Sequence, residues 1–394
     1  YDRRRPEIDA WLEAERKKTP PFFYTSVDLR HSGPKLAPVD TNLYPAGFNN
    51  LSPSSQVRAA EMARHFFSTR YPQARKLAVL TENHTRNLHY LENTRILKSI
   101  LENAGFDVRL TGLWEEEENE RKLTTSSERD VTIERLKRAG NRVETHAGFT
   151  PDIVISNNDF TSGAPAELEG IEQPVAPPVA MGWWRRLKSD HFTAYTQVAD
   201  AFAEHFGIDP WLITTWFHSC GEVDFKSGEG VECVAKAVDE MIARIADKYA
   251  QYGITDDPHV FVKADSGTYG MGIMSVRSGE EMRSLNKKHR NQMQVIKGGA
   301  VNTRVIIQEG VKTADIIGGQ SAEPVVYLID GQAVGGFNRV NSEKDAYTNL
   351  NARGMSFATL CENAPHIGYE TGSCRILGFV AELAAIAAAR EPRN

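Results

Sequence analysis

Short apolar runs alternate with amphipathic stretches in the first half of the chain. Residues 76–81, 106–110 and 152–156 are apolar runs of strand length. Between the first two, leucine, isoleucine and alanine recur at helical spacing, and Gly105 stands where a glycine commonly ends a helix. A shorter helix is predicted near 130–139. Strands that alternate with helices predict a small parallel, doubly wound α/β sheet.

The pattern changes after residues 173–178, a proline-rich stretch that is the candidate linker. Apolar residues from Phe192 to Phe206 step by three and four, which predicts an amphipathic helix. Residues 19–60 are rich in Pro, Gly, Asn and Ser and predict a long extended loop, and loops of that length are often functional. Two further helices are predicted at 230–252 and 376–387. Four strands are predicted at 259–263, 273–276, 305–308 and 325–329.

Composition narrows the class of protein without identifying an activity. The length of 394 residues predicts two or three domains, and a net charge of −6 argues against a general nucleic-acid binder. No apolar run of about 18 residues is present to span a membrane. The first residues lack the apolar region of a secretory signal, and the four cysteines show no C-x-x-C spacing, so we expect a cytoplasmic protein with reduced thiols. Cys220 is expected to be a buried thiol without a neighbouring cysteine.

The strongest chemical signal is a strand that ends in Lys263 and continues into glycines at G-x-x-G-x-G spacing, from Gly267 to Gly272, before a second strand. Glycines let backbone N–H groups approach phosphate oxygens closely, and a lysine supplies positive charge. The loop is neither a Walker A sequence nor the dinucleotide fingerprint. From these residues alone, a phosphate-binding loop and a plain glycine-rich hairpin are about equally good interpretations.

Further residues fit a nucleotide and metal site. Lys188 precedes the helix at 192–206, and residues 305–311 form a strand that runs into a polar hinge. Asp40 and Asn42 make an acid-x-Asn pair, whose oxygens point the same way on an extended strand and suit Mg²⁺. The alternative is a pair of turn-forming side chains. No His-Glu-x-x-His sequence is present, so a zinc hydrolase is disfavoured.

The two lysines, the glycine loop and the acidic hinge together resemble the ATP-grasp ligases, in which two antiparallel-sheet subdomains clamp ATP. The acid-x-Asn stretch resembles the metal strand of eukaryotic glutathione synthetases, which are circularly permuted ATP-grasp enzymes. Arg30 and the runs 39–51, 156–160 and 182–192 occur in this order ahead of the Lys263 loop. That combination resembles the proteobacterial ATP-grasp type of glutamate–cysteine ligase over essentially the full length.

The resemblance implies roles for individual residues. ATP would be bound by Lys188, Lys263, Ser266, Gly267, Tyr269, Gly270, Gly272, Gln308, Glu309 and Val311. Substrate would be bound by Ser26, Asp28, Arg30, Tyr44, Asn49, Arg339, Asn349 and Asn351, and Mg²⁺ by Asp40, Asn42 and Asp265. Arg339, as a carboxylate clamp, and Lys263 would be the catalytic residues.

The resemblance also implies a reaction: ATP and Mg²⁺ would support joining of L-glutamate to L-cysteine through a γ-glutamyl phosphate, the first step of glutathione biosynthesis. The alternatives are another amino-acid ligase, such as glutathione synthetase, and a non-catalytic ATP-binding regulator. The expected organisation is an N-terminal segment (1–65) that packs on the clamp, a Rossmann-like α/β domain (66–178) and an ATP-grasp domain (179–394). No nucleic-acid or membrane partner is expected, and a homo-oligomer is left open.

Overall fold

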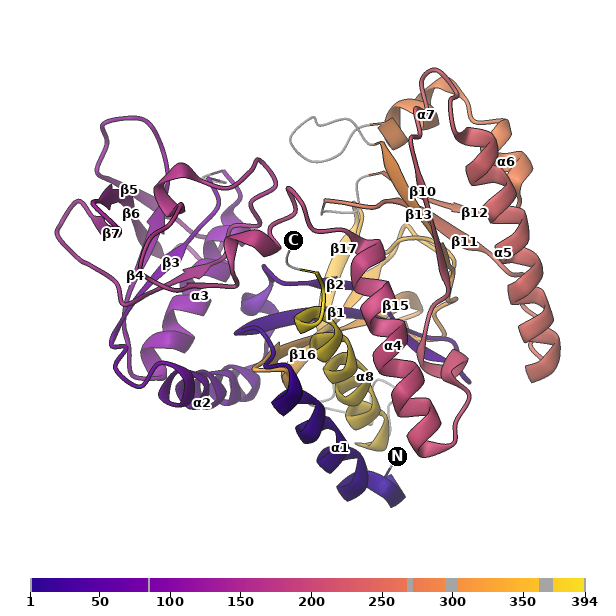
Figure 1. Ribbon diagram of the computed structural model, residues 1–394, viewed down its shortest axis with the longest axis horizontal. Helices are drawn as coiled ribbons and strands as arrows, with labels where there is room; N and C mark the ends of the chain where they lie inside the picture. Colours follow the sequence, from indigo (N-terminus) through magenta and orange to yellow (C-terminus); the bar gives the residue numbers. More distant parts are fainter. Residues whose placement is uncertain (1, 84–85, 268–271, 295–302, 361–370, 393–394) are drawn as a thin grey trace.

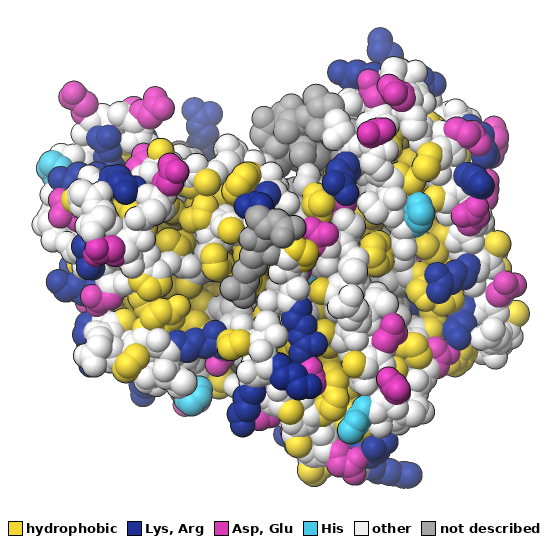
Figure 2. Space-filling model, in the orientation of Figure 1, with side chains coloured by type: hydrophobic (Ala, Val, Ile, Leu, Met, Phe, Trp, Pro, Cys, Tyr) yellow, Lys and Arg dark blue, Asp and Glu magenta, His cyan; other side chains and the backbone are white. Residues whose placement is uncertain are grey.

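Three β-sheets organise the computed structural model, which describes residues 2–83, 86–267, 272–294, 303–360 and 371–392. A mixed seven-stranded sheet lies at one end of the molecule, a six-stranded antiparallel sheet in the middle and a four-stranded antiparallel sheet at the other end (Figure 1). None of the helices within these ranges has the length and hydrophobicity needed to cross a bilayer. On the face drawn in Figure 2, charged side chains of both signs are interspersed.

The seven-stranded sheet is built around parallel strands, as the alternating pattern predicts. Its order is β5-β6-β4-β3-β8-β9, with β7 beside β6, and β3 pairs in parallel with both β4 and β8. The strands and the two helices packed on this part of the chain are β3 (Lys76–Leu80), β4 (Asp107–Gly112), β5 (Glu120–Thr124), β6 (Asp130–Ala139), β7 (Arg142–Thr145), β8 (Ile153–Ser156), β9 (Val175–Ala176), α2 (Pro53–Arg70) and α3 (Leu88–Asn103).

The helix predicted near 130–139 is wrong, because this segment is strand β6. Val131 and Ile133 alternate into the core, and the strand hydrogen-bonds with β5, β4 and β7. The two-residue period of these buried positions fits a strand better than a helix, and pairing with three neighbouring strands decides the outcome.

The central sheet joins the two ends of the sequence. Its order is β17-β16-β15-β1-β2, with β14 beside β15, and β1 pairs antiparallel with both β2 and β15. Its strands are β1 (Tyr24–His31), β2 (Leu36–Asn42), β14 (Ile316–Ile317), β15 (Gln320–Ile329), β16 (Gln332–Asn341) and β17 (Met355–Thr359).

Residues 19–60 are therefore not mainly a loop: they form β1, β2 and the beginning of α2. The Pro, Gly, Asn and Ser residues that suggested a loop lie largely in the turns, whereas most β1 residues are buried.

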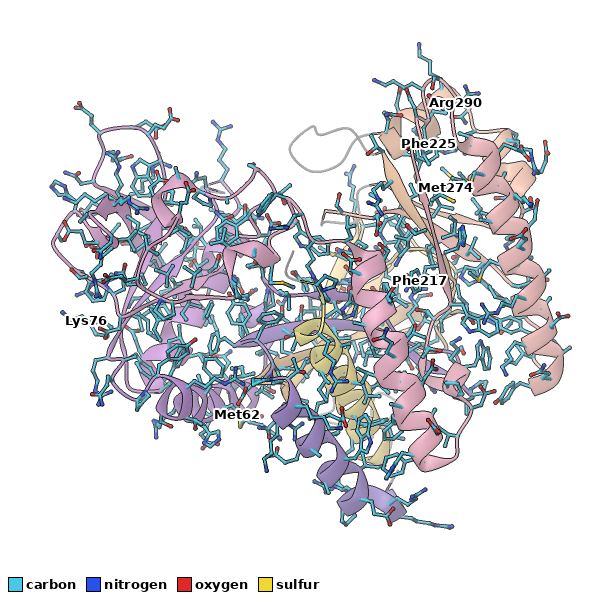
Figure 3. The ribbon with its side chains drawn as sticks, in the orientation of Figure 1. Met62, Lys76, Phe217, Phe225, Met274 and Arg290 are labelled. Atoms are coloured by element: carbon cyan, nitrogen blue, oxygen red, sulfur yellow. The ribbon has the colours of Figure 1, made fainter. Side chains whose placement is uncertain are left out.

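The four-stranded sheet has the order β10-β13-β11-β12 and forms a lobe with α5. Phe225 and Met274 lie in this lobe, and Phe217, at the start of β10, packs on Phe192 of helix α4 (Lys188–Phe206) with ring centroids 6.0 Å apart (Figure 3). The elements of this lobe are β10 (Phe217–Gly221), β11 (Val260–Ala264), β12 (Ile273–Val276), β13 (Arg304–Glu309), α5 (Val231–Tyr252), α6 (Gly279–Arg283) and α7 (Lys287–Gln294).

Three helices cover one face of the central sheet: α1 (Arg5–Lys18), α4 (Lys188–Phe206) and α8 (Thr371–Ala389) (Figure 1). Helix α8 is rich in alanine, and most of its residues from Leu377 onward are buried, so the other helices and the sheet approach it closely. The predicted helices at 192–206, 230–252 and 376–387 and the four strands after residue 258 are confirmed. The predicted domain boundaries at residues 65 and 178 stay predictions. Helix α2 runs continuously across the first of them.

The expectation that Cys220 has no cysteine neighbour is wrong. Its sulfur lies 3.5 Å from that of Cys233, at the beginning of α5, and both thiols are free. The two residues are thirteen apart in the chain, and only the packing of α5 on β10 brings them together.

Candidate active site

A cavity opens between the central sheet and the four-stranded sheet. The central sheet contributes residues of β1, β2 and β15, and the four-stranded sheet contributes residues of β11 and β12. The beginning of α4 and two loops complete the wall. The lining residues are Asp28, Arg30, Val39, Asp40, Lys188, Phe261, Lys263, Ala264, Ser266, Gly267, Ile273, Glu323, Asn349 and Asn351.

Two lysines and an aspartate meet on one side of this cavity. The Lys188 ammonium lies 2.8 Å from Oδ1 of Asp40, and Lys263 donates to the backbone oxygen of Val39 at 3.0 Å. Burial lowers the pKa of Lys263 to about 8. Burial alone would raise the pKa of Asp40, but the charges of Lys188 and Lys263 hold it at about 2. The structure therefore concentrates positive charge at the position where the sequence predicts phosphate binding.

The three predicted metal ligands, Asp40, Asn42 and Asp265, have different hydrogen-bond partners in the structure. Asp265 is fully buried, and its two carboxylate oxygens accept hydrogen bonds from the Ser189 N–H and hydroxyl, each at 2.8 Å, at the start of α4. Asn42 accepts from the Tyr44 N–H at 2.9 Å, which is the turn-forming arrangement considered from sequence. Asp40 alone of the three lines the cavity. Within the described ranges, no three His, Cys, Asp or Glu side chains are placed to hold a metal ion.

Asp40 nevertheless suits a magnesium ion shared with a nucleotide. Mg²⁺ is commonly held by one or two carboxylates, with phosphate oxygens and water completing its shell. The ionised Asp40 carboxylate beside two lysines matches that donor set.

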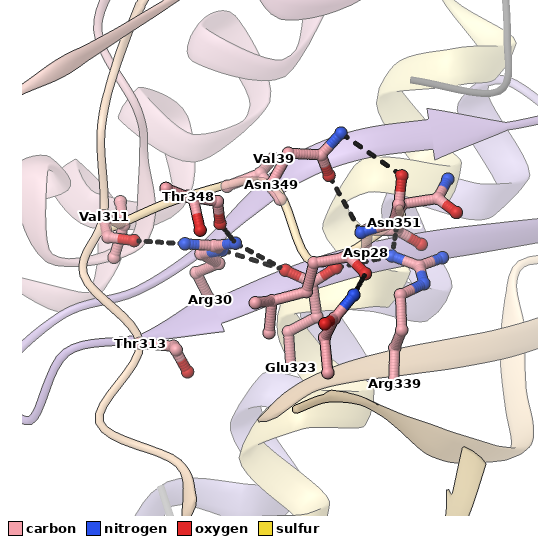
Figure 4. Close-up of polar contacts among 12 residues, drawn as sticks. Asp28, Arg30, Val39, Val311, Thr313, Glu323, Arg339, Thr348, Asn349 and Asn351 are labelled. Atoms are coloured by element: carbon pink, nitrogen blue, oxygen red, sulfur yellow. Dashed lines mark hydrogen bonds and ion pairs between the residues drawn. The ribbon is translucent and has the colours of Figure 1, made fainter. Parts of the chain in front are cut away.

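Four alternating charges lie on the other side of the cavity (Figure 4): Asp28, Arg30 and Glu323 line it, whereas Arg339, which pairs with two of them, is not among the lining residues. Arg339 donates to Asp28 at 2.7 Å and to Glu323 at 2.5 Å, and Glu323 also accepts from Arg30 at 2.9 Å. Burial raises the pKa of Asp28 despite its arginine partner. For Glu323, burial acts in the same direction, but Arg30 and Arg339 lower its pKa overall. Arg339 Nε is buried without a hydrogen-bond partner in the described residues.

Two side chains of the predicted hinge, Gln308 and Glu309, form hydrogen bonds with buried lysines. Gln308 accepts from Lys263 at 2.6 Å, which links the hinge to the lysine of the cavity. Glu309 does not line the cavity: its Oε1 accepts from the buried Lys35 at 2.6 Å and from the Trp211 indole at 2.9 Å, and its Oε2 accepts from the Trp216 N–H at 3.1 Å. Burial lowers the pKa of Lys35 to about 8, although Glu309 opposes that effect.

A second buried network supports the side of the cavity that holds Lys188, Lys263 and Asp40, the phosphate side. Glu391, just beyond α8, forms two hydrogen bonds of 2.7 Å with Arg186 and lies 2.7 Å from Nδ1 of His191. Arg186 also donates to the backbone oxygen of Thr41 at 2.8 Å, between Asp40 and Asn42. The network therefore holds the strand that carries Asp40.

The remaining predicted residues fall into two groups. Ser26, Tyr44, Asn49, Gly272 and Val311 are described, but they are not among the residues lining the cavity. Tyr269 and Gly270 lie outside the described residues.

Sequence reasoning missed Glu323, Lys35 and the Arg186–Glu391 pair. For Glu323 a signal was available, because it is the lone acid of strand β15 and stands just before its apolar run. A charge inside a buried strand needs a partner.

Two antiparallel sheets that enclose a cavity with two lysines match the arrangement expected of an ATP-grasp ligase. A family model described as glutamate-cysteine ligase (GshA) matches residues 2–392, so the chain belongs to that family and is a ligase. A crystal structure of a Methylobacillus flagellatus KT protein, assigned as a gamma-glutamylcysteine synthetase, is similar at 41% identity with a TM-score of 0.90, covering 98% of this chain and 93% of that one.

Two more distant structures were also found. A glutathione synthetase-like effector (GSS30) from Globodera pallida has 10% identity and a TM-score of 0.39, covering 90% of this chain and 78% of that one. D-alanyl-alanine synthetase A from Vibrio cholerae O1 biovar eltor str. N16961 has 10% identity and a TM-score of 0.36, covering 79% of each chain. No curated protein matches the chain.

Proposed function

We propose that the enzyme forms γ-glutamylcysteine from L-glutamate, L-cysteine and ATP, with Mg²⁺ as the divalent metal, in the cytoplasm. The observation that carries the proposal is the division of the cavity into two sides. Lys188, Lys263 and Asp40 suit a triphosphate with its metal, whereas Asp28 and Glu323, both hydrogen-bonded by Arg339, suit an amino acid, which has both carboxylate and ammonium groups.

The chemistry follows from the weakness of a free carboxylate as an acyl donor. The γ-carboxylate oxygen of glutamate attacks the γ-phosphorus of ATP, the bond to the bridging oxygen breaks, and ADP leaves. The cysteine amine then attacks the acyl carbon, loses a proton, and inorganic phosphate leaves. Protein groups that align the reactants and neutralise developing charge are sufficient for such transfers.

Each part of the cavity has a place in this scheme. Lys188 and Lys263, with the backbone of Ser266 and Gly267, bind the phosphates, and the hinge from Gln308 to Val311 receives the nucleoside. Magnesium, held by Asp40, would neutralise phosphate charge. On the amino-acid side, Arg339, which donates to Asp28 and Glu323, binds a substrate carboxylate. Asp28 receives a substrate ammonium group, and Asn349 and Asn351 contact the same substrate from the loop.

ADP release measured with defined substrate pairs tests the proposal. Glutamate plus cysteine should give ADP and phosphate, and omission of either amino acid should abolish their release. Activity with γ-glutamylcysteine plus glycine, and none with the first pair, would identify a glutathione synthetase instead. ATP binding without ADP release for any pair would identify a regulator.

A further inference from the structure

Each nitrogen of the Arg30 guanidinium has a partner in the protein. Nε and Nη2 both lie 2.9 Å from Oε2 of Glu323. Nη1 donates to the backbone oxygens of Val311 and Ala346 at 3.3 and 3.1 Å, and Nη2 donates to that of Thr348 at 2.6 Å (Figure 4). Four of these contacts are hydrogen bonds, and the fifth, between Nη2 and Glu323, is an ion pair. Arg30 is 2% exposed and each of its guanidinium nitrogens already has a protein partner, so the side chain offers little to a substrate carboxylate.

The three backbone oxygens belong to two segments that flank the cavity. Val311 lies in the hinge after β13, whereas Ala346 and Thr348 lie in the loop that carries Asn349 and Asn351 into the cavity wall. The Thr313 N–H donates to the same Ala346 oxygen at 3.1 Å, so hinge and loop also meet directly. Arg30 itself is on β1 and is anchored there by Glu323 of β15. The guanidinium thus joins a fixed sheet, the hinge and the loop.

Only an arginine can make this junction. Its planar fork presents donors in several fixed directions, whereas a lysine ammonium is a single compact charge that reaches fewer acceptors at once. A lysine at position 30 would retain an ion pair with Glu323 and lose part of the set of backbone oxygens. Arg339 differs, because its Nε has no partner among the described residues. The two buried arginines of this cluster therefore have different tasks.

We propose that Arg30 is a positioning residue, not a substrate ligand: it ties the loop at 345–351 to the nucleotide hinge, so that nucleotide binding orders the loop that meets the amino acid. This inference rests on the proposed function for the identity of the ligands. Coupling between two sites is reciprocal, so glutamate would strengthen nucleotide binding by the same factor by which nucleotide strengthens glutamate binding. A factor of about ten is typical of such coupling.

Hydrogen exchange of the full-length protein tests the tie. In the absence of ligand, peptides from residues 342–354 should exchange faster in Arg30→Lys than in the wild type. Addition of Mg²⁺ and a non-hydrolysable ATP analogue should slow their exchange in the wild type, but not in Arg30→Lys. In calorimetric titrations, the wild type should bind the analogue about tenfold more tightly with glutamate present, and this factor should approach one in Arg30→Lys.

Arg70→Lys is the matched control, because Arg70 also joins a carboxylate, Asp330, to a backbone oxygen, that of Pro21 at 2.8 Å, but it does not line the cavity. It should behave as the wild type. Arg339→Lys should weaken glutamate binding while the loop still becomes protected by nucleotide. If Arg30→Lys does not fold, Glu323→Gln replaces it, because it loosens the anchor of the same guanidinium.

If peptides from residues 342–354 of Arg30→Lys exchange at the wild-type rate, both with and without nucleotide, the proposed link between loop and hinge is wrong. The proposed function fails by a different result, namely no ADP release from wild-type protein with glutamate and cysteine. Hydrogen exchange of ligand-free Arg30→Lys tests the link between loop and hinge whether or not the proposed function holds.

Discussion

Replacement of Glu391 by glutamine should destabilise the protein by about 3 kcal/mol at neutral pH. The side chain is 1% exposed and holds both Arg186 and His191. Burial by itself raises the pKa of Glu391, but the charge and hydrogen bonds of Arg186 dominate and lower it from 4.5 to about 2. A difference of about 2.5 pH units, at about 1.4 kcal/mol for each, corresponds to roughly 3 kcal/mol. Loss of one partner of a buried ion pair commonly has an effect of about 3–5 kcal/mol.

The pH dependence follows from the direction of the shift. Because the pKa of Glu391 is lower in the folded than in the unfolded protein, its contribution is fully present above about pH 5 and is lost as the pH falls toward 2. The difference between wild type and Glu391→Gln should therefore be largest at pH 7 and less than half as large at about pH 3.

Urea unfolding followed by tryptophan fluorescence measures this difference. Trp183 is a suitable reporter, since its ring lies 4.8 Å from the Arg186 guanidinium. Glu13→Gln is the control, because Glu13 is half-exposed and its ion pairs with Arg16 and Lys17 should contribute less than about 1 kcal/mol. Equal urea midpoints for wild type and Glu391→Gln at pH 7, or a difference that does not change from pH 7 to pH 3, would refute the reasoning.

Further outcomes are expected in the ADP-release assay. Lys263→Met should lower kcat by about 100-fold or more, whereas the exposed Lys236→Met should have no effect. Because burial lowers the pKa of Lys263 to about 8, kcat/KM for ATP should fall as the pH rises through 8, since only the ammonium form attracts phosphate; a profile that is flat to pH 10 would contradict this. Asp40→Asn should cut turnover and raise the Mg²⁺ concentration required; near-normal activity would exclude Asp40 as a metal ligand. Arg339→Lys should raise KM for glutamate by about tenfold or more, and an unchanged KM would remove Arg339 from the substrate site.

Much of the phosphate side could be predicted from the sequence. Lys263 stands at the end of an apolar strand and before glycines, and that local order predicts a lysine presented at the edge of a sheet. Lys188 and Asp40 were also predicted, and all three residues line the cavity. Such positions are accessible to sequence reasoning because short-range order determines where a strand or helix ends.

The partner that each polar side chain binds could not be predicted in the same way. Asp265 and Asn42 have the residue types of metal ligands, but Asp265 binds the first turn of α4 and Asn42 closes a turn. The partner of Glu309 is Lys35, which a local pattern could not indicate, since the two residues are 274 positions apart. A carboxylate looks the same in sequence whether it faces a ligand or a buried lysine.

The sequence by itself determined most of the elements after residue 60 and the chemical inventory, because periodic burial and glycine placement act over a few residues. Only the tertiary structure decided that residues 19–60 complete the central sheet and that Asp40 meets a lysine 148 residues away, while Asp28 meets an arginine 311 residues away. Buried charges must find partners wherever the packed chain offers them, because unpaired charge in the interior is strongly unfavourable. That requirement involves the whole fold, and it leaves the cavity with two lysines on one side and an arginine held between two acids on the other.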